Sequence, residues 1–282
     1  MIRPTARCEA DWLVLDAPLP EERHRSNLAG REIGEAAATL LTLNALLPLG
    51  WKYAMVGHAD LRIRAERPTP TEADEMAAQL AKLESDYASI VESLADTPDG
   101  SPPEAPPSSI TASPETANLC HEAGWPFEER DDGGLIVDLG VPGAFVPALI
   151  EVRASRISIE AIIATVPPER IAEERYIALA SLMLRVNGAF RMVRAVSRDT
   201  QNGGEIPGER RVLLEAPLPL DAGSAEFDRA LGAVAVAARH CAAEAESLLA
   251  DALLARAYLR RDHQQTRLKP TPEFDASTAA WA

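Results

Sequence analysis

The residues of this sequence that come nearest to a reactive group are two pairs of neighbours, Cys120-His121 and His240-Cys241. Each pair puts a thiol beside an imidazole, which suggests a zinc site or a cysteine nucleophile with its base. Zinc sites are normally marked by two cysteines or two histidines a few residues apart, and this sequence has no such spacing. Adjacent side chains on a helix also point about 100° apart, so one pair does not easily chelate an ion.

A cysteine hydrolase needs more than a thiol and an imidazole. It also requires an oxyanion hole, and the sequence contains neither a nucleophile elbow nor a known catalytic cysteine motif. Cys120 and Cys241 lie in stretches rich in Ala and Leu, where a small buried thiol is the usual outcome. We therefore predict that the protein is not an enzyme and holds no metal and no cofactor.

Two further stretches look superficially like ligand sites. The acidic run at 128–132, followed by Gly133-Gly134, lacks the spacing of an EF-hand calcium loop. The segment DTQNGGEIPG at 199–208 lacks the G-x-x-x-x-G-K-[ST] pattern that cradles phosphates. Both are interpreted as polar hairpin loops.

Aromatic residues are scarce, at 5% of the chain, so each position is informative. Two interpretations stay open for them: packing in a core, or an exposed patch that binds a partner. The candidate partner-binding residues are Trp51, Tyr53, Trp125, Phe127 and Phe145. Phe274 and Trp281, in a polar tail, form a second candidate docking motif or merely belong to a disordered end.

The net charge of the chain indicates which classes of partner it disfavours. The 282 residues carry a formal net charge of −15, which argues against binding to nucleic acid or to an anionic membrane surface. No run of about 18 apolar residues and no signal-peptide core is present, so we expect a cytoplasmic protein. The three cysteines are too few and too scattered for a disulfide framework.

The elements that would position a site come in two similar sets. A Pro-rich segment at 96–113 reads as an extended linker between an N-terminal unit, 1–95, and a C-terminal unit, 114–261. A tail at 262–282 is expected to be disordered. An internal repeat constrains the fold more strongly than any single motif, so the two units are expected to share one plan.

The C-terminal unit is predicted to be the complete one. Apolar alternation and turn residues predict a helix from Pro114 to about Gly124, three antiparallel strands between about 127 and 165, and a deeply buried helix from 169 to 186. Asn187-Gly188 is expected to end that helix in the left-handed conformation. A hairpin and a final helix at about 225–259 follow.

The N-terminal unit repeats this plan with its front removed. It begins at the third strand, residues 12–15, and continues with a helix ending at Asn44, a hairpin over 51–65 and a helix at 72–94. The first sheet would then have three strands and one open edge. Because an open edge must be paired or covered, we expect the second unit or another subunit to cover it.

The order helix, three strands, helix, two strands, helix resembles the type III secretion chaperone-like fold of the Tir chaperone family and the YbjN-like sensory transduction regulators. The segments that carry the resemblance are WPFEERDDGGLIVDL, LASLMLRVNGAF and RRVLLEAPLPLDAGSAEFDRAL, with LTLNALLPLGWKYAM and LRIRAER in the first copy. The N-x-x-LP-x-G pattern of the first copy matches well, whereas Arg191 and Val193 replace its Pro and Gly in the second.

The resemblance implies an α+β fold, a tandem repeat of antiparallel sheets packed by helices, in which the first copy is truncated. It also implies a non-enzymatic protein-binding module, chaperone-like or regulatory, that presents a groove or patch to a protein client. Two copies in one chain would form a covalent pseudo-dimer, either as a monomer or as a homodimer. The alternatives left open are a small-molecule sensor with a pocket between the halves and an enzyme with an unrecognised site.

Overall fold

The computed structural model describes residues 4–19, 30–56, 60–95, 110–111, 114–141, 143, 145–153, 156–171, 173–199 and 208–264. Residues 96–109 and 112–113 of the predicted linker, 200–207 of the predicted hairpin loop and 265–282 of the predicted tail lie outside the described residues, as do Phe274 and Trp281. Among the described residues, no helix is long and apolar enough to cross a membrane.

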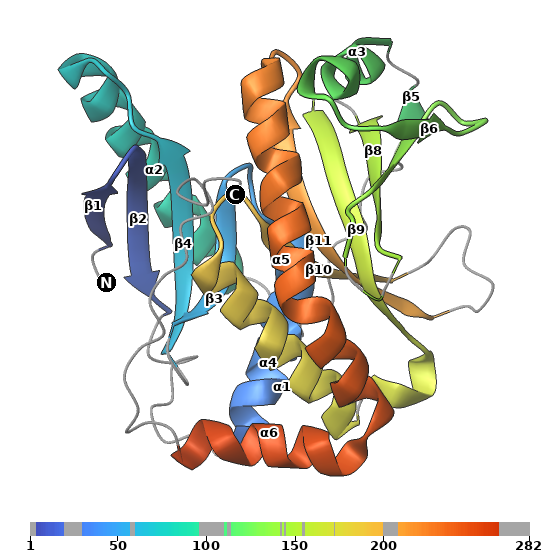
Figure 1. The fold of residues 1–282 in the computed structure, drawn as a ribbon. Coiled ribbons are helices and arrows are strands. Elements are labelled where there is room, and N and C mark those ends of the chain that lie inside the picture. The colour runs from blue at the N-terminus through green and yellow to red at the C-terminus, as the bar shows by residue number, and fades with distance from the viewer. Residues whose placement is uncertain are drawn as a thin grey trace.

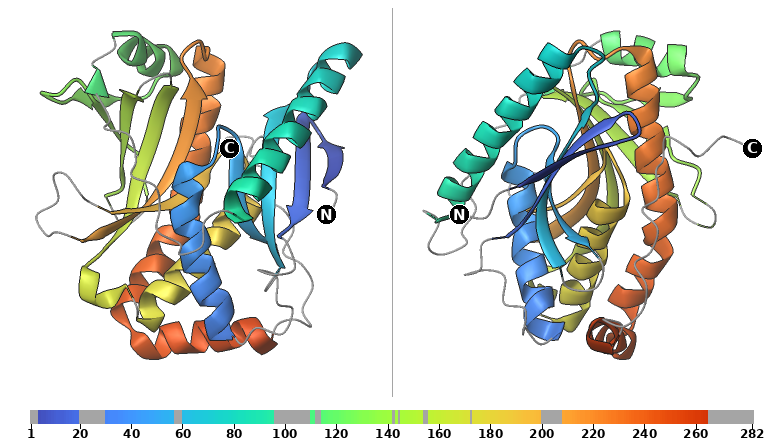
Figure 2. Two further views of the ribbon diagram at one scale, coloured as in Figure 1. Left: turned by 180° about the vertical axis from the view of Figure 1, so that it is seen from behind. Right: turned by 90° about the vertical axis from the view of Figure 1, so that its left-hand side faces the viewer.

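Two antiparallel sheets face each other across a layer of helices (Figures 1 and 2). The first sheet has the order β1-β2-β4-β3 and the second β10-β11-β9-β8-β7-β6, with β5 paired to β8. The strands of the first sheet are β1 (Thr5–Glu9), β2 (Trp12–Pro18), β3 (Trp51–Val56) and β4 (Asp60–Pro68). Those of the second are β5 (Ile110–Thr111), β6 (Phe127–Glu129), β7 (Leu135–Asp138), β8 (Pro147–Arg153), β9 (Arg156–Val166), β10 (Arg194–Asp199) and β11 (Arg210–Pro219).

The helices are α1 (Gly30–Leu43), α2 (Ala73–Ala95), α3 (Pro114–Ala123), α4 (Glu174–Ala189), α5 (Ser224–Ala250) and α6 (Ala252–Gln264), with short 3₁₀ turns at Asn44–Leu46 and Pro168–Arg170. The single helix predicted at 225–259 is thus two helices. Asp251 separates them, and its side chain accepts hydrogen bonds from the backbone N–H groups of Leu253 and Leu254, as at a helix N-cap. The helical structure therefore extends to residue 264, past the predicted start of the tail.

The predicted α+β class is confirmed, but the three strands predicted between about 127 and 165 are four, β6 to β9. The series β1-β2-α1-β3-β4-α2 recurs as β8-β9-α4-β10-β11-α5, and corresponding strands have the same order within their sheets. Among its described residues, the first copy has no counterparts of α3, β6 and β7. We call the two series the first and second repeat.

The prediction of a three-stranded first sheet with an open edge is wrong. Strand β1 pairs with β2 through a two-residue turn at Ala10-Asp11, in register from Glu9 opposite Trp12 to Thr5 opposite Asp16. The outer edge of β2 is therefore paired with the chain's own residues 5–9. The strand was missed because its side chains are mostly exposed and show no apolar alternation.

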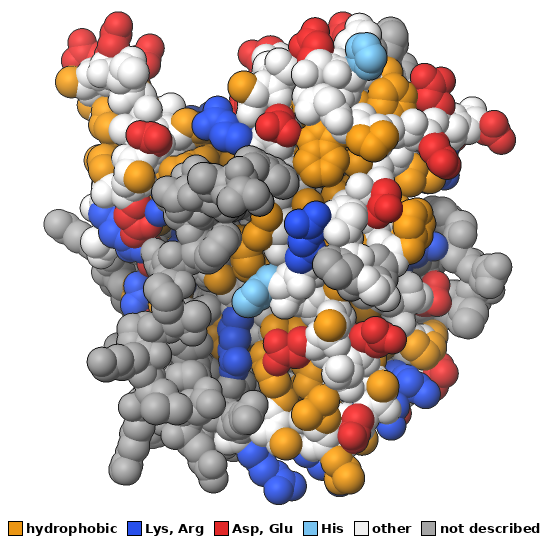
Figure 3. All heavy atoms as spheres, viewed as in Figure 1, with side chains coloured by type: hydrophobic (Ala, Val, Ile, Leu, Met, Phe, Trp, Pro, Cys, Tyr) orange, Lys and Arg blue, Asp and Glu red, His pale blue; other side chains and the backbone are white. Residues whose placement is uncertain are grey.

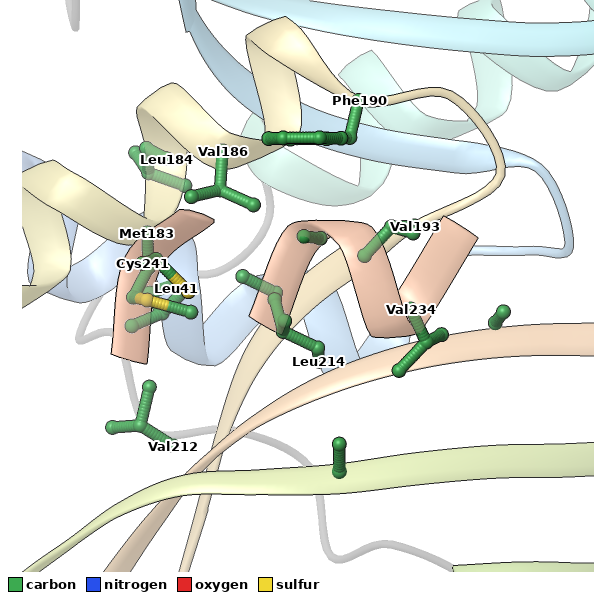
Figure 4. Close-up of a cluster of buried hydrophobic side chains, with 14 of the residues drawn as sticks. Leu41, Met183, Leu184, Val186, Phe190, Val193, Val212, Leu214, Val234 and Cys241 are labelled. Carbon is green, nitrogen blue, oxygen red and sulfur yellow. The ribbon is translucent and has the colours of Figure 1, made fainter. Parts of the chain in front are cut away.

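Helix α4 forms the centre of the molecule. Its predicted burial on all sides is confirmed, since it packs against α1, α5, α6, β3 and β10. In this arrangement α4 of the second repeat packs on β3 of the first, and α1 of the first packs on β10 of the second. Figure 4 shows part of the resulting core, to which Leu41 of α1, Met183 of α4 and Cys241 of α5 all belong. Each repeat therefore completes its core with the other.

Gly188 has a different role from the one predicted. Asn187 and Gly188 lie within the last turn of α4, and neither adopts a left-handed backbone; the residue with positive φ is Met192, at 61°. A Cβ at Gly188 would lie 2.5 Å from the carbonyl oxygen of Met55 in β3. The glycine is thus required for the close approach of α4 to the backbone of β3.

Candidate ligand-binding pocket at the junction of the repeats

Two buried asparagines join the edge strands β3 and β10. The Asn44 side-chain oxygen accepts the backbone N–H of Tyr53 at 2.6 Å, and the Asn187 oxygen accepts that of Ala195 at 2.5 Å. Asn187 also donates through Nδ2 to the Tyr53 carbonyl oxygen at 2.8 Å, which links the two repeats. Because both asparagines are fully buried, these amides replace the strand partners that β3 and β10 lack at their outer edges.

Lys52, near the start of β3, reaches from the first repeat into the second. Its ammonium donates to the Phe190 carbonyl oxygen at 2.6 Å and forms an ion pair with Glu66 at 2.7 Å. Lys52 and Glu66 are almost fully buried. Burial lowers the pKa of Lys52 below its ordinary value, and the nearby Glu66 charge only partly offsets that effect.

Arg194, at the start of β10, makes the reciprocal connection. Its guanidinium donates to the carbonyl oxygens of Leu47 at 2.8 Å and Trp51 at 3.2 Å in the first repeat, and it pairs with Glu215. Burial alone would raise the pKa of Glu215, but the charges of Arg194 and Arg198 outweigh it and hold that pKa below its ordinary value. Lys52 of the first repeat is therefore held by the turn before β10, and Arg194 of the second repeat is held by the turn before β3.

A pocket of about 460 Å³ opens beside these two ion pairs. Its first wall is formed by β3, β4, the turn before β3 and α2, and its second by the turn after α4, the end of β11 and the start of α5. Apolar side chains from both walls line it, among them Trp12, Leu49, Trp51, Met192 and Leu218. The charged lining consists of Lys52, Glu66, Arg67, Lys82, Arg194 and Glu226.

Arg67 is held at the pocket by the turn before β3. Its Nη2 donates to the Leu49 carbonyl oxygen at 2.5 Å, and its guanidinium lies over Gly50. Gly50 has a φ of 78°, and an added Cβ would lie 2.9 Å from Nη1 of Arg67, so this position requires glycine for both backbone and space. Burial lowers the pKa of Arg67, although the charge of Asp86 partly opposes that shift.

Three polar atoms belonging to lining side chains have no hydrogen-bond partner within the described part of the chain. They are Nε1 of Trp51, Oε1 of Glu66 and Oε1 of Gln79. The Trp51 ring itself is fixed, because it stacks on Tyr87 of α2 with a centroid separation of 6.5 Å. A buried indole N–H without an acceptor costs about 1–3 kcal/mol, and such atoms are commonly satisfied by water or a ligand.

The predicted aromatic candidates separate into two groups. Trp51 and Tyr53 are each 1% exposed, so these two pack in the core and do not form an exposed patch. Trp51 nevertheless lies at the wall of the pocket. The sequence did not identify Arg67, Lys82 and Gln79 as lining residues, because they lie on β4 and α2 and no motif connects them. The available signal for this site was Gly50 of the N-x-x-LP-x-G pattern.

Trp125 and Phe127 lie at the start of β6, and Phe145 precedes β8, which β7 separates from β6 in the second sheet. The Trp125 indole donates to Asp228 at 2.8 Å and is half-buried, as is Phe127, whereas Phe145 is 72% exposed. Figure 3 shows hydrophobic side chains at the surface beside α3 and the neighbouring end of α5. This end of the sheet is a second, shallower candidate for partner binding.

The Cys-His pairs do not form a site within the described residues, where no group of three or more metal-binding side chains occurs. Burial raises the pKa of Cys120 to about 11 and that of Cys241 to about 12. The His240 ring packs on Phe190 with a centroid separation of 5.3 Å. No known protein family, curated protein or solved structure matches the chain.

Proposed function

We propose that the protein is a non-enzymatic receptor that binds a small organic molecule in the pocket at the junction of the repeats. The observation that carries this proposal is the pocket itself. Its volume of about 460 Å³ falls in the range of small-molecule sites, about 300–1,000 Å³, and like them it combines apolar walls with a few polar groups. The position between two structural units is also typical of such sites.

The composition of the walls favours binding over catalysis. The described lining side chains include no Ser, Thr, Cys or His, the types that most often act as nucleophile or base. Glu66 and Lys52 neutralise each other in an ion pair, and Arg194 pairs with Glu215. These pairs make a fixed polar floor for the pocket.

Because the walls belong to different repeats, an occupied pocket would stabilise their junction. A ligand that binds the folded state alone raises the free energy of unfolding in proportion to the logarithm of its concentration. This coupling of occupancy to the packing of two halves is what a regulatory sensor needs.

Binding can be tested with N-phenyl-1-naphthylamine, a neutral fluorescent probe. The proposal expects saturable binding of one probe per chain, with quenching of tryptophan fluorescence. Gln79→Trp, which places a large ring in the pocket, should abolish it. Glu84→Trp, at an exposed position on the same helix and outside the lining, serves as the control and should bind normally. Binding that survives Gln79→Trp, or no binding by the parent protein to this probe or to a charged analogue, would refute the proposal.

A second candidate function is the binding of a protein client at the end of the second sheet. The observation that favours it is the 72% exposure of Phe145, in a part of the chain that also carries the half-buried Trp125 and Phe127, since large exposed aromatic side chains mark interaction surfaces. Affinity capture from lysate with the parent chain and with Phe145→Ser tests it. A partner retained equally by both would exclude this surface.

We also propose that the chain is a monomeric pseudo-dimer. The edge strands β3 and β10, which a homodimer of single repeats would have to cover, are packed against α4 and α1 of the same chain. Sedimentation equilibrium should then give a mass near 30.3 kDa, and a mass of twice that value would contradict it.

A further inference from the structure

We infer that the molecule bound at the junction is an organic anion with an apolar body, recognised by Arg67 and Lys82. The inference rests on the proposed function and names the chemical class of its ligand. A carboxylate, sulfonate or phosphate ester attached to an aromatic or aliphatic group has this chemistry. Neither residue was connected with a site by the sequence.

The charge of the pocket is opposite to that of the chain. The protein carries a formal net charge of −15, yet the pocket is lined by four cationic side chains and two carboxylates. Lys52 and Arg194 are committed to ion pairs with Glu66 and Glu215. Arg67 and Lys82 are the remaining cations of the lining.

Arg67 has hydrogen-bonding capacity to spare. A guanidinium has five N–H donors, and the described residues supply one acceptor to it, the carbonyl oxygen of Leu49. No carboxylate of the described residues lies within ion-pair distance of Arg67, and Asp86 acts on it only through longer-range attraction. A partly buried guanidinium with unused donors is suited to bidentate binding of a carboxylate or a phosphate.

Lys82 adds a second positive charge from a different element. It lies on α2, three residues after Gln79, so both side chains project from the same side of the helix toward the pocket. Among the described residues Lys82 has no ion-pair partner. An anionic group in the pocket would thus have Lys82 and Gln79 of α2 as partners besides Arg67 of β4, without displacing any existing pair.

The apolar lining accounts for the rest of the ligand. Trp12, Leu49 and Trp51 come from the first repeat, and Met192 and Leu218 from the second. A body that fills the space between them buries apolar surface on both sides, which contributes about 25 cal/mol per Å². Glu226, the carboxylate without a described ion pair, belongs to the second wall and so disfavours an anionic group at that end.

The test compares two probes that differ only in an anionic group. These are 8-anilino-1-naphthalenesulfonate and its neutral parent N-phenyl-1-naphthylamine, titrated against the full chain at pH 7. One charge-assisted contact corresponds to about a tenfold to hundredfold change in affinity, so the sulfonate should bind at least about tenfold more tightly. Equal affinities would overturn the inference and leave the receptor function intact, whereas binding of neither probe would overturn both.

Two variants locate the recognition. Arg67→Gln and Lys82→Gln should each weaken the sulfonate by about tenfold and change the affinity of the neutral probe by less than about twofold. Lys82 is exposed, so its variant should fold even if Arg67→Gln does not. Arg229→Gln, an exposed arginine outside the lining, is the matched control for non-specific attraction. A sulfonate preference that persists in Lys82→Gln, or falls equally in Arg229→Gln, would contradict the assignment.

Discussion

Replacement of Asn187 by Ala is the sharpest test of how the two repeats are joined. The substitution removes an acceptor from the backbone N–H of Ala195 and a donor from the carbonyl oxygen of Tyr53. Both groups are buried at the junction, where water does not easily replace the amide. The repeats would then keep their apolar contacts but lose the side chain that connects their edge strands.

The expected loss follows from these two bonds. A buried polar group left without its partner costs about 1–3 kcal/mol. The Ala195 N–H loses an acceptor at 2.5 Å, for which we take about 2 kcal/mol. The Tyr53 oxygen keeps a weak contact with Asn44 Nδ2 at 3.4 Å, so its loss is smaller, about 1 kcal/mol. The free energy of unfolding should fall by about 3 kcal/mol, a large part of the 5–15 kcal/mol typical of a domain.

Urea unfolding followed by tryptophan fluorescence and by far-ultraviolet circular dichroism measures this loss. Asn44→Ala is the matched control, because it removes an acceptor within the first repeat alone and should cost about 2 kcal/mol. With the junction weakened, Asn187→Ala should also separate the fluorescence and dichroism transitions, which coincide in a cooperative unit. A loss below about 1 kcal/mol for Asn187→Ala would show that the amide bonds do not join the repeats.

Three further predictions follow from burial at other positions. In the native protein at pH 8, a thiol reagent should modify the exposed Cys8 rapidly. Cys120 and Cys241 should stay unmodified, because burial raises their pKa values to about 11 and about 12. Rapid modification of all three cysteines would contradict this. Glu215 has a lowered pKa, so its charge stabilises the fold above the ordinary carboxyl pKa of 4.5, and this stabilisation is lost as the pH falls through the lower folded value. The stability of Glu215→Gln should therefore lie well below that of the parent at pH 7 and approach it in acid; a constant difference would exclude the charge effect. Gly188→Ala should lower stability by about 1–3 kcal/mol through overpacking, measured by urea unfolding, and an unchanged midpoint would mean that α4 shifts freely on β3.

Much of the architecture could be predicted from periodicity. The apolar run at 169–186 predicted a helix buried on all sides, which the structure has at Glu174–Ala189. Asn44 and Asn187 marked equivalent points of the two repeats. What the sequence did not show was the function of Asn187, because its partner across the junction, the carbonyl oxygen of Tyr53, lies 134 residues away along the chain. The exposed strand at 5–9 carried no periodic signal, since alternation appears only where one face is buried.

The candidate site was beyond sequence reasoning for a related reason. Arg67 and Lys82 look like ordinary surface cations, and Met192 lies far from both along the chain. They line one pocket only because α4 packs on β3 and brings its following turn against the first repeat. Trp51 is a second example. The alternation of side chains placed it on one face of a strand, but it did not show that α2 covers that face.

The contacts across the junction also determine the order in which the chain can fold. Lys52 and Phe190 are separated by 138 residues, and Tyr53 and Asn187 by 134. Pairings of such long sequence separation form slowly. During synthesis the first repeat leaves the ribosome long before residues 187–194 are made. Until then the outer edge of β3 is uncovered. Unpaired strand edges recruit other chains in that interval, and the amount of folded protein obtained in a cell should depend on how fast the ribosome reaches α4.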